Sequence, residues 1–234
     1  MYTCKYARLF EKGGRNTEHT LKAVLFDFDG TIADTGRGII NCVKKVLKDN
    51  AIEEKDESRL RYFIGPPLVV SFRHLFGLDE DTAQEYVRQY RVYYSQGGMY
   101  ELDLYGGIPE TLERIRVAGP VMGIASSKPG VYLQALLEHL GIAPYFSCIS
   151  APEIGTVNPP KRELIAAAME KLNVRPEECV MVGDRFFDIE GGAQAGVRTI
   201  GAAYGYGGRA EMEEYNATWV AETTTEIAEL IEKL

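Results

Sequence analysis

Two aspartates, Asp27 and Asp29, lie one residue apart at the end of the apolar run 22–29, and Gly30 and Thr31 follow at once. Side chains at positions i and i+2 of an extended chain point to the same side, so both carboxylates can face one reacting atom. One ionised aspartate can attack phosphorus, while the other can donate a proton to a leaving alcohol and later take one from water. Alone, such a pair is more typical of a turn aspartate followed by a helix cap.

Polar and charged residues also stand at the ends of other apolar runs. They are Ser126, Ser127 and Lys128 at the end of the run 120–127, Asp184 and Asp188 at and after the end of the run 179–184, and Lys161 at the start of the helical pattern before that run. Each alone is typical of a helix cap or of a surface lysine. Because the carboxyl ends of parallel strands share one edge, where ligands bind, we expect these groups to converge.

Carboxylates that converge need a counter-charge. Two of them about 4 Å apart repel by about 4 kcal/mol at an effective dielectric constant of 20. A few hard oxygen ligands without histidine or cysteine nearby favour Mg²⁺, which shares its coordination shell with water and phosphate oxygens. Lys161 and the hydroxyls of Ser126 and Ser127 would hold the remaining phosphate oxygens.

The composition indicates a soluble globular protein. The chain has 234 residues, of which 45% are hydrophobic and 26% charged, and this length fits one large domain or a core with a smaller insert. The net charge of −8 argues against a general nucleic-acid or membrane-surface binder. We find no apolar run that is long enough for a membrane span or, within residues 1–20, for a signal peptide.

Four scattered cysteines, Cys4, Cys42, Cys148 and Cys179, form no C-x-x-C pair or other zinc or haem spacing. They favour reduced thiols in a cytoplasmic protein. Residues 1–20 are interpreted as a polar extension.

Short, continuous apolar runs predict strands that are covered on both faces of a parallel sheet. They span residues 22–29, 120–127, 146–151, 179–184, 197–203 and 217–222. Helical patterns lie between the later runs, at 129–141, 161–173 and 187–196, the last closed by Gly196. This alternation predicts an open, doubly wound, Rossmann-like α/β core.

Residues 36–103 interrupt the alternation, because helical patterns at 38–50 and 79–96 are separated by nothing that resembles a buried strand. The segment is too long for an ordinary connection, and it contains enough apolar residues for a small core. We therefore expect residues 21–35 and 104–234 to form the catalytic core and residues 36–103 an inserted α-helical cap. The alternative is a single α/β domain with a long crossover.

Taken together, these motifs resemble the haloacid-dehalogenase-like (HAD) phosphohydrolase superfamily from about residue 22 to the end of the chain. The matching set is Asp27-x-Asp29-Gly30-Thr31, Ser126-Ser127-Lys128, Lys161 and Gly183-Asp184-Arg-Phe-Phe-Asp188. The stretches YFIGPPLVVSF, YGGIPETLERI and YGYGGRAE are similar to the phosphoglycolate-phosphatase-like branch, which has an α-helical cap.

The resemblance implies a role for each motif residue. Asp27 would be the nucleophile and a Mg²⁺ ligand, and Asp29 the general acid/base, with its backbone carbonyl on the metal. Asp184 would bind the metal, and Asp188 would do so directly or through water. Ser126 and Lys161 would hold the phosphate with the help of the Ser127 N–H. The dehalogenases that named the superfamily lack the second aspartate, so Asp29 favours phosphoryl chemistry.

The predicted function is a Mg²⁺-dependent phosphatase that hydrolyses a small-metabolite phosphomonoester through an aspartyl-phosphate. A phosphosugar mutase of the same superfamily, a nucleotidase or pyrophosphatase, and a binding protein without activity are the alternatives. We expect a small phosphorylated metabolite as partner, neither nucleic acid nor membrane, and a monomer or homodimer.

The substrate itself stays open. In the cap, Arg61 and Arg73 are interpreted as exposed surface residues rather than as ligands of a second anionic group. Tyr204 and Tyr206 would line the entrance or pack a glycine-rich loop.

Overall fold

A computed structural model describes residues 20–156 and 158–234, so all of the predicted N-terminal extension except Thr20 lies outside the described residues. The six predicted strands are present. They are β1 (Ala23–Phe26), β4 (Val121–Ala125), β5 (Phe146–Ser150), β6 (Cys179–Gly183), β7 (Arg198–Ala202) and β8 (Trp219–Ala221). All pair in parallel, in the order β5-β4-β1-β6-β7-β8.

Strand β1 lies between β4 and β6 and is in register with both, since Ala23 is paired with Val121 on one side and with Cys179 on the other. The carboxyl ends of β4, β1 and β6 are therefore adjacent. These are the strands that the polar motifs follow in the sequence, so the topology brings the motifs to one edge.

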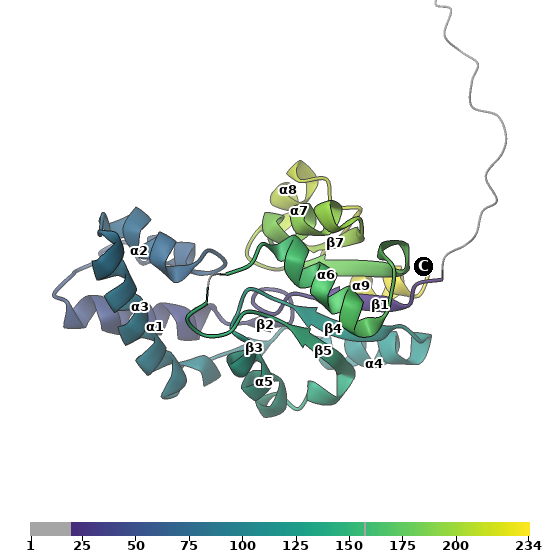
Figure 1. Ribbon diagram of the computed structural model, residues 1–234, viewed down its shortest axis with the longest axis horizontal. Helices are drawn as coiled ribbons and strands as arrows, with labels where there is room; N and C mark the ends of the chain where they lie inside the picture. Colours follow the sequence, from purple (N-terminus) through teal and green to yellow (C-terminus); the bar gives the residue numbers. More distant parts are fainter. Residues whose placement is uncertain (1–19, 157) are drawn as a thin grey trace, which may run out of the picture.

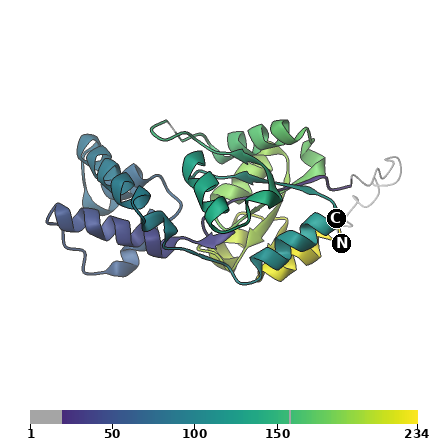
Figure 2. The ribbon, with the colours of Figure 1, turned by 90° about the horizontal axis from the view of Figure 1, so that it is seen from below.

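Helices cover both faces of the sheet (Figure 1). They are α4 (Ile108–Ala118), α5 (Gly130–His139), α6 (Lys161–Leu172), α7 (Phe186–Ala195), α8 (Gly208–Glu214) and α9 (Thr224–Ile231). Val24 and Phe26 of β1 belong to the apolar cluster that includes α4, α5 and α9, whereas Ala23 and Leu25 belong to the one that includes α6. Helices α4 and α9 lie side by side (Figure 2). Burial on both faces is why the central strands β1 and β6 are apolar throughout rather than alternating.

Residues 36–103, which lie between β1 and β4 and are called the helical segment below, are mostly helical, as predicted. The helical segment contains α1 (Gly36–Asp49), the 3₁₀ helix η1 (Glu57–Phe63), α2 (Leu68–Phe76), α3 (Glu80–Ser95) and the 3₁₀ helix η2 (Gly98–Tyr100). Helices α1 to α3 lie beyond the end of the sheet, on the left of Figure 1. The buried side chains of this segment include the rings of Phe63 in η1, Phe72 in α2 and Tyr86 in α3.

A short antiparallel ribbon, which the sequence did not predict, joins this segment to the rest. Strand β2 (Ala33–Asp34) pairs with β3 (Asp103–Leu104), with Ala33 opposite Leu104. The two crossings of the chain are therefore neighbours. We keep the division into a core and a cap of residues 36–103 as a proposal.

Phe72 holds the helical segment together, since its fully buried ring lies 4.7 Å from that of Phe63 and 5.5 Å from that of Tyr86. We expect Phe72→Ala to lower the free energy of unfolding by about 3–5 kcal/mol because it leaves a cavity. Urea denaturation measures this loss. The control Val92→Ala removes a side chain that is 51% exposed, and we expect a change below about 0.5 kcal/mol. A loss below about 1 kcal/mol for Phe72→Ala would mean that the segment has no tightly packed core.

Two further observations concern the described residues alone. Among them, no helix combines the length and the apolar character that crossing a lipid bilayer requires. Cys42, Cys148 and Cys179 are free thiols, whereas Cys4 lies outside the described residues.

Candidate active site

Three buried carboxylates lie together at the carboxyl ends of β1 and β6. Asp27 follows β1 directly, and its N–H still donates to the Val182 carbonyl of β6 at 2.9 Å, so the strand ladder holds it in place. Asp184 follows β6, and Asp188 lies in the first turn of α7. One oxygen from each of the three lies within 4.8 Å of the others. The arrangement offers oxygen ligands from two strand ends and one helix.

Lys161 supplies a positive charge to this cluster. Its Nζ lies 2.9 Å from Asp27 Oδ1 and 2.7 Å from Asp188 Oδ1, and it also donates to the Ala125 carbonyl at 3.1 Å. Pro160 precedes it with extended backbone angles, so α6 begins at Lys161 and points it toward the strand ends. Burial lowers the pKa of Lys161, but Asp188 and Asp27 outweigh it and hold this pKa above its ordinary value. The lysine therefore stays charged and links the ends of β1, β4 and α7.

Burial and mutual repulsion make two of the acids reluctant to ionise. Burial, with Asp188 and Asp27 nearby, raises the pKa of Asp184 well above its ordinary value. Its two oxygens accept from Thr31 Oγ1 at 3.2 Å and from the Tyr206 N–H at 2.8 Å. For Asp188, burial raises the pKa to about 6, because Lys161 offsets only part of the effect of burial and of Asp27. Such shifts are expected where several carboxylates are buried close together.

The turn after Asp27 is compact because the N–H groups of Thr31, Ile32 and Ala33 all donate to the Phe28 carbonyl, at 3.0–3.3 Å. Gly30 has a φ of +85°, and a Cβ built on it would lie 2.1 Å from Asp184 Oδ2. The glycine thus meets two demands, a left-handed backbone and a close approach to the carboxylate.

The carboxylate of Asp29 does not belong to the three-carboxylate cluster. Its oxygens accept from Lys128 Nζ at 2.9 and 3.1 Å. Ser126 is buried at the end of β4, and its Oγ accepts from the Lys128 N–H at 3.3 Å, while Ser127 is partly buried. The sequence places Lys128 in the motif after β4 but does not reveal its partner, because Asp29 lies 99 residues away in the chain.

Sequence reasoning also missed contacts between the loops after β6 and β7 and the helical segment. Arg185 Nη1 donates to the Ile64 carbonyl at 3.0 Å, and its Nε donates to Glu211 at 3.0 Å. The hydroxyl of Tyr206 accepts from the Gly36 N–H at 2.8 Å and donates to Asp34 at 2.7 Å. These contacts tie the segment to the loop that carries Asp184.

A cavity of about 270 Å³ lies at this junction. Its walls include Arg61, Tyr62 and Pro66 on one side and Arg185, Gly205 and Tyr206 on the other. Arg61 is exposed, as predicted, and nevertheless lines this cavity. Arg73 is also exposed and pairs with Glu80 at 2.7 Å. Tyr204 donates to the Thr31 carbonyl at 2.7 Å, so it packs against the turn after Asp27.

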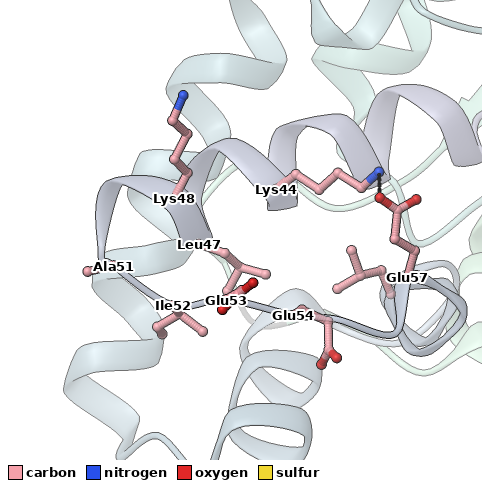
Figure 3. A pocket seen from close by; sticks show the side chains of 9 residues that line it. Lys44, Leu47, Lys48, Ala51, Ile52, Glu53, Glu54 and Glu57 are labelled. Atoms are coloured by element: carbon pink, nitrogen blue, oxygen red, sulfur yellow. Dashed lines mark ion pairs between the residues drawn. The ribbon is translucent and has the colours of Figure 1, made fainter.

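A larger cavity of about 450 Å³ lies between α1 and the chain that follows it (Figure 3). Its charged side chains have both signs, and Lys44 pairs with Glu57 at 2.7 Å. None of the predicted site residues lines it. The size of a cavity alone therefore does not identify the site. The cluster at the strand ends is the better candidate because it holds carboxylates and a lysine close together.

Comparisons with known proteins place the chain in a family. Residues 24–202 match the family model of haloacid dehalogenase-like hydrolases. A 5'-nucleotidase of Pseudomonas aeruginosa is 37% identical over 195 residues, which cover 83% of this chain and 88% of that protein. A predicted phosphatase from Clostridium acetobutylicum is 34% identical with a TM-score of 0.86, over 92% of this chain and all of that one.

One similar protein has a name that indicates a different activity. The solved structure of Protein Tyrosine Kinase A (PtkA) of Mycobacterium tuberculosis is 32% identical with a TM-score of 0.78, over 91% of this chain and 98% of that one. Phosphoglycolate phosphatases are also among the relatives. The comparisons confirm the predicted superfamily, its α/β fold and the predicted enzyme class, a phosphatase. The chain belongs to the haloacid dehalogenase-like hydrolase family.

Proposed function

We propose that this protein is a Mg²⁺-dependent phosphatase that hydrolyses a small phosphomonoester through an aspartyl-phosphate on Asp27. The observation that carries the proposal is the buried cluster of Asp27, Asp184 and Asp188 around Lys161. A nucleophilic carboxylate beside a cation-binding pair of acids suits phosphoryl transfer to an oxygen acceptor.

The donor set fits a hard divalent cation. Three carboxylates have oxygens within 4.8 Å of one another, and when ionised they outnumber the single ammonium of Lys161. Carboxylate oxygens without nitrogen or sulfur ligands favour Mg²⁺. Asp27 and Asp184 would hold it, with Asp188 binding directly or through water and the Asp29 carbonyl adding a ligand. When bound, the cation neutralises repulsion between the Asp27 carboxylate and the phosphate dianion.

The chain's own residues then supply the steps. The Asp27 carboxylate attacks phosphorus, the bond to the ester oxygen breaks, and Asp29 donates its proton to that oxygen. Asp29 next takes a proton from a water molecule that attacks the aspartyl-phosphate, which releases phosphate and restores Asp27. Lys161, the Ser126 hydroxyl and the Ser127 N–H hold the non-reacting phosphate oxygens.

The cap selects the substrate in this proposal. The contact between Arg185 and Ile64 and the cavity beside it support a site closed by residues 36–103. The names of the relatives, a 5'-nucleotidase and a phosphoglycolate phosphatase, support a small phosphorylated metabolite and make both esters the first to test. Transfer of the phosphoryl group to tyrosine, which the name PtkA suggests, is the second candidate.

Removal of divalent cations tests the proposal. We expect dialysis against EDTA to lower phosphate release by at least about 100-fold, because the acids then repel the phosphate dianion, and Mg²⁺ to restore it. Phosphate released from a panel of purified esters, with and without Mg²⁺, is the measurement. No release under either condition would favour a binding protein, isomerised sugar phosphate without free phosphate a mutase, and labelled phosphotyrosine a kinase.

A further inference from the structure

Lys128 is a buried lysine whose charge the proposed mechanism does not use. It lies in the loop between β4 and α5, and its side chain is 6% exposed. Its Nζ donates to both oxygens of Asp29, at 2.9 and 3.1 Å. An ammonium group that contacts both oxygens holds a carboxylate at a fixed distance from the lysine.

The two lysines of the site divide the acids between them. Lys161 pairs with Asp27 and Asp188, which belong to the three-carboxylate cluster. Among the described residues, Lys128 pairs with Asp29 alone. One lysine therefore serves the nucleophile and the cation site, and the other serves the acid that must reach the leaving oxygen.

An aromatic wall from the helical segment holds Lys128 in place. Its Nζ lies 5.0 Å from the ring centroid of Tyr94 on α3, close enough for a cation–π contact. The Tyr94 ring is itself packed between Tyr90, 5.3 Å away, and Tyr132 of α5, 5.2 Å away. Tyr94 and Tyr90 belong to residues 36–103, whereas Lys128 and Asp29 lie in the α/β core. The contact thus crosses between the two.

We propose that Lys128 is a positioning residue for Asp29 and that Tyr94 couples this positioning to the placement of the helical segment. The inference rests on the proposed general-acid role of Asp29. A proton donor is effective only within hydrogen-bond reach of the atom it protonates. An acid that is not held in place therefore protonates the leaving oxygen more slowly. When the segment carrying Tyr94 moves away, Lys128 loses the contact with the Tyr94 ring, keeps only the more distant Phe28 ring at 6.0 Å, and holds Asp29 less firmly.

Two esters with different leaving groups test the role of Lys128. A p-nitrophenyl group leaves readily as an anion, whereas an alkyl alcohol needs a proton. We expect Lys128→Met to lower kcat/KM by about 100-fold on the alkyl phosphate and by no more than about tenfold on p-nitrophenyl phosphate. We expect Lys128→Arg, which keeps a charged donor, to have a kcat/KM on the alkyl phosphate within about tenfold of that of the original protein.

A double-mutant cycle with Asp29→Asn separates positioning from other roles. The Asp29→Asn variant cannot donate the proton. Adding Lys128→Met to it should therefore lower kcat/KM on the alkyl phosphate by less than about threefold more. Equal losses on both esters, or losses that multiply in the double variant, would overturn the inference in favour of a structural or substrate-binding lysine.

Tyr94→Leu keeps the inference testable if Lys128→Met does not fold. It removes the ring beside Nζ, and we expect about fivefold loss, again larger on the alkyl ester. The control is Tyr93→Leu on the same helix, whose ring faces Lys45 at 5.6 Å, with less than about twofold change. No preference between esters for Tyr94→Leu would remove the coupling. If the unaltered protein hydrolyses neither ester, the proposed function fails and the inference falls with it.

Discussion

Asp27→Asn is expected to lower kcat by at least about 10⁴-fold, because an amide cannot form the acyl-phosphate. The fold should survive, since asparagine has nearly the same shape and its amide relieves repulsion from Asp184 and Asp188. Phosphate release at saturating ester and Mg²⁺ measures the rate, and thermal unfolding checks the fold. The melting temperature should be unchanged or higher.

A matched substitution elsewhere controls for the chemistry of the change. Asp103 pairs with Arg37 at 3.1 Å, with a side chain that is 76% exposed, far along the chain from the cluster. Asp103→Asn should keep kcat within about twofold of the original value. If Asp27→Asn retained kcat within about tenfold, another residue would have to be the nucleophile.

Gly30→Ala should strongly destabilise the protein. The new Cβ would lie 2.1 Å from Asp184 Oδ2 and 2.6 Å from the Tyr206 ring, at a φ of +85°. We expect a loss of at least about 3 kcal/mol in the free energy of unfolding, since backbone strain and a displaced carboxylate add together. Phosphate release should fall by at least about 100-fold with the cation site.

Gly77→Ala separates the two causes. Gly77 has a φ of +66°, but a Cβ there would meet nothing within 4 Å. It should lose only about 1–2 kcal/mol from backbone strain, and its activity should be unaffected. Denaturant unfolding of both variants gives the comparison. Equal losses for the two glycines would show that the carboxylate moves aside at no cost, which would contradict a rigid site.

The centre of the sheet was predictable because β1 and β6 are buried on both faces, so each appears in the sequence as an apolar run. Strand β1 nevertheless ends at Phe26, although the apolar run continues through Phe28. Phe28 is fully buried in the turn after Asp27 rather than in a strand, and hydrophobicity alone cannot distinguish these two environments. The ribbon of β2 and β3 has two residues per strand, too few to show any period.

The cluster of Asp27, Asp184 and Asp188 could be anticipated from parallel topology, because polar residues after neighbouring strands must share an edge. The partners of Asp29 and Arg185 could not. Lys128 lies 99 residues from Asp29, and Ile64 lies 121 residues from Arg185. Such contacts depend on how the helical segment is placed over the sheet, and no local pattern in the sequence encodes that placement.

The pairing of Ala33 with Leu104 means that the helical segment leaves the sheet and returns to it at one point. A chain of another length or sequence can be spliced between two neighbouring residues without altering the spacing of the strands beneath. Evolution can thus exchange the helical segment while the sheet and the acids at its strand ends are inherited intact.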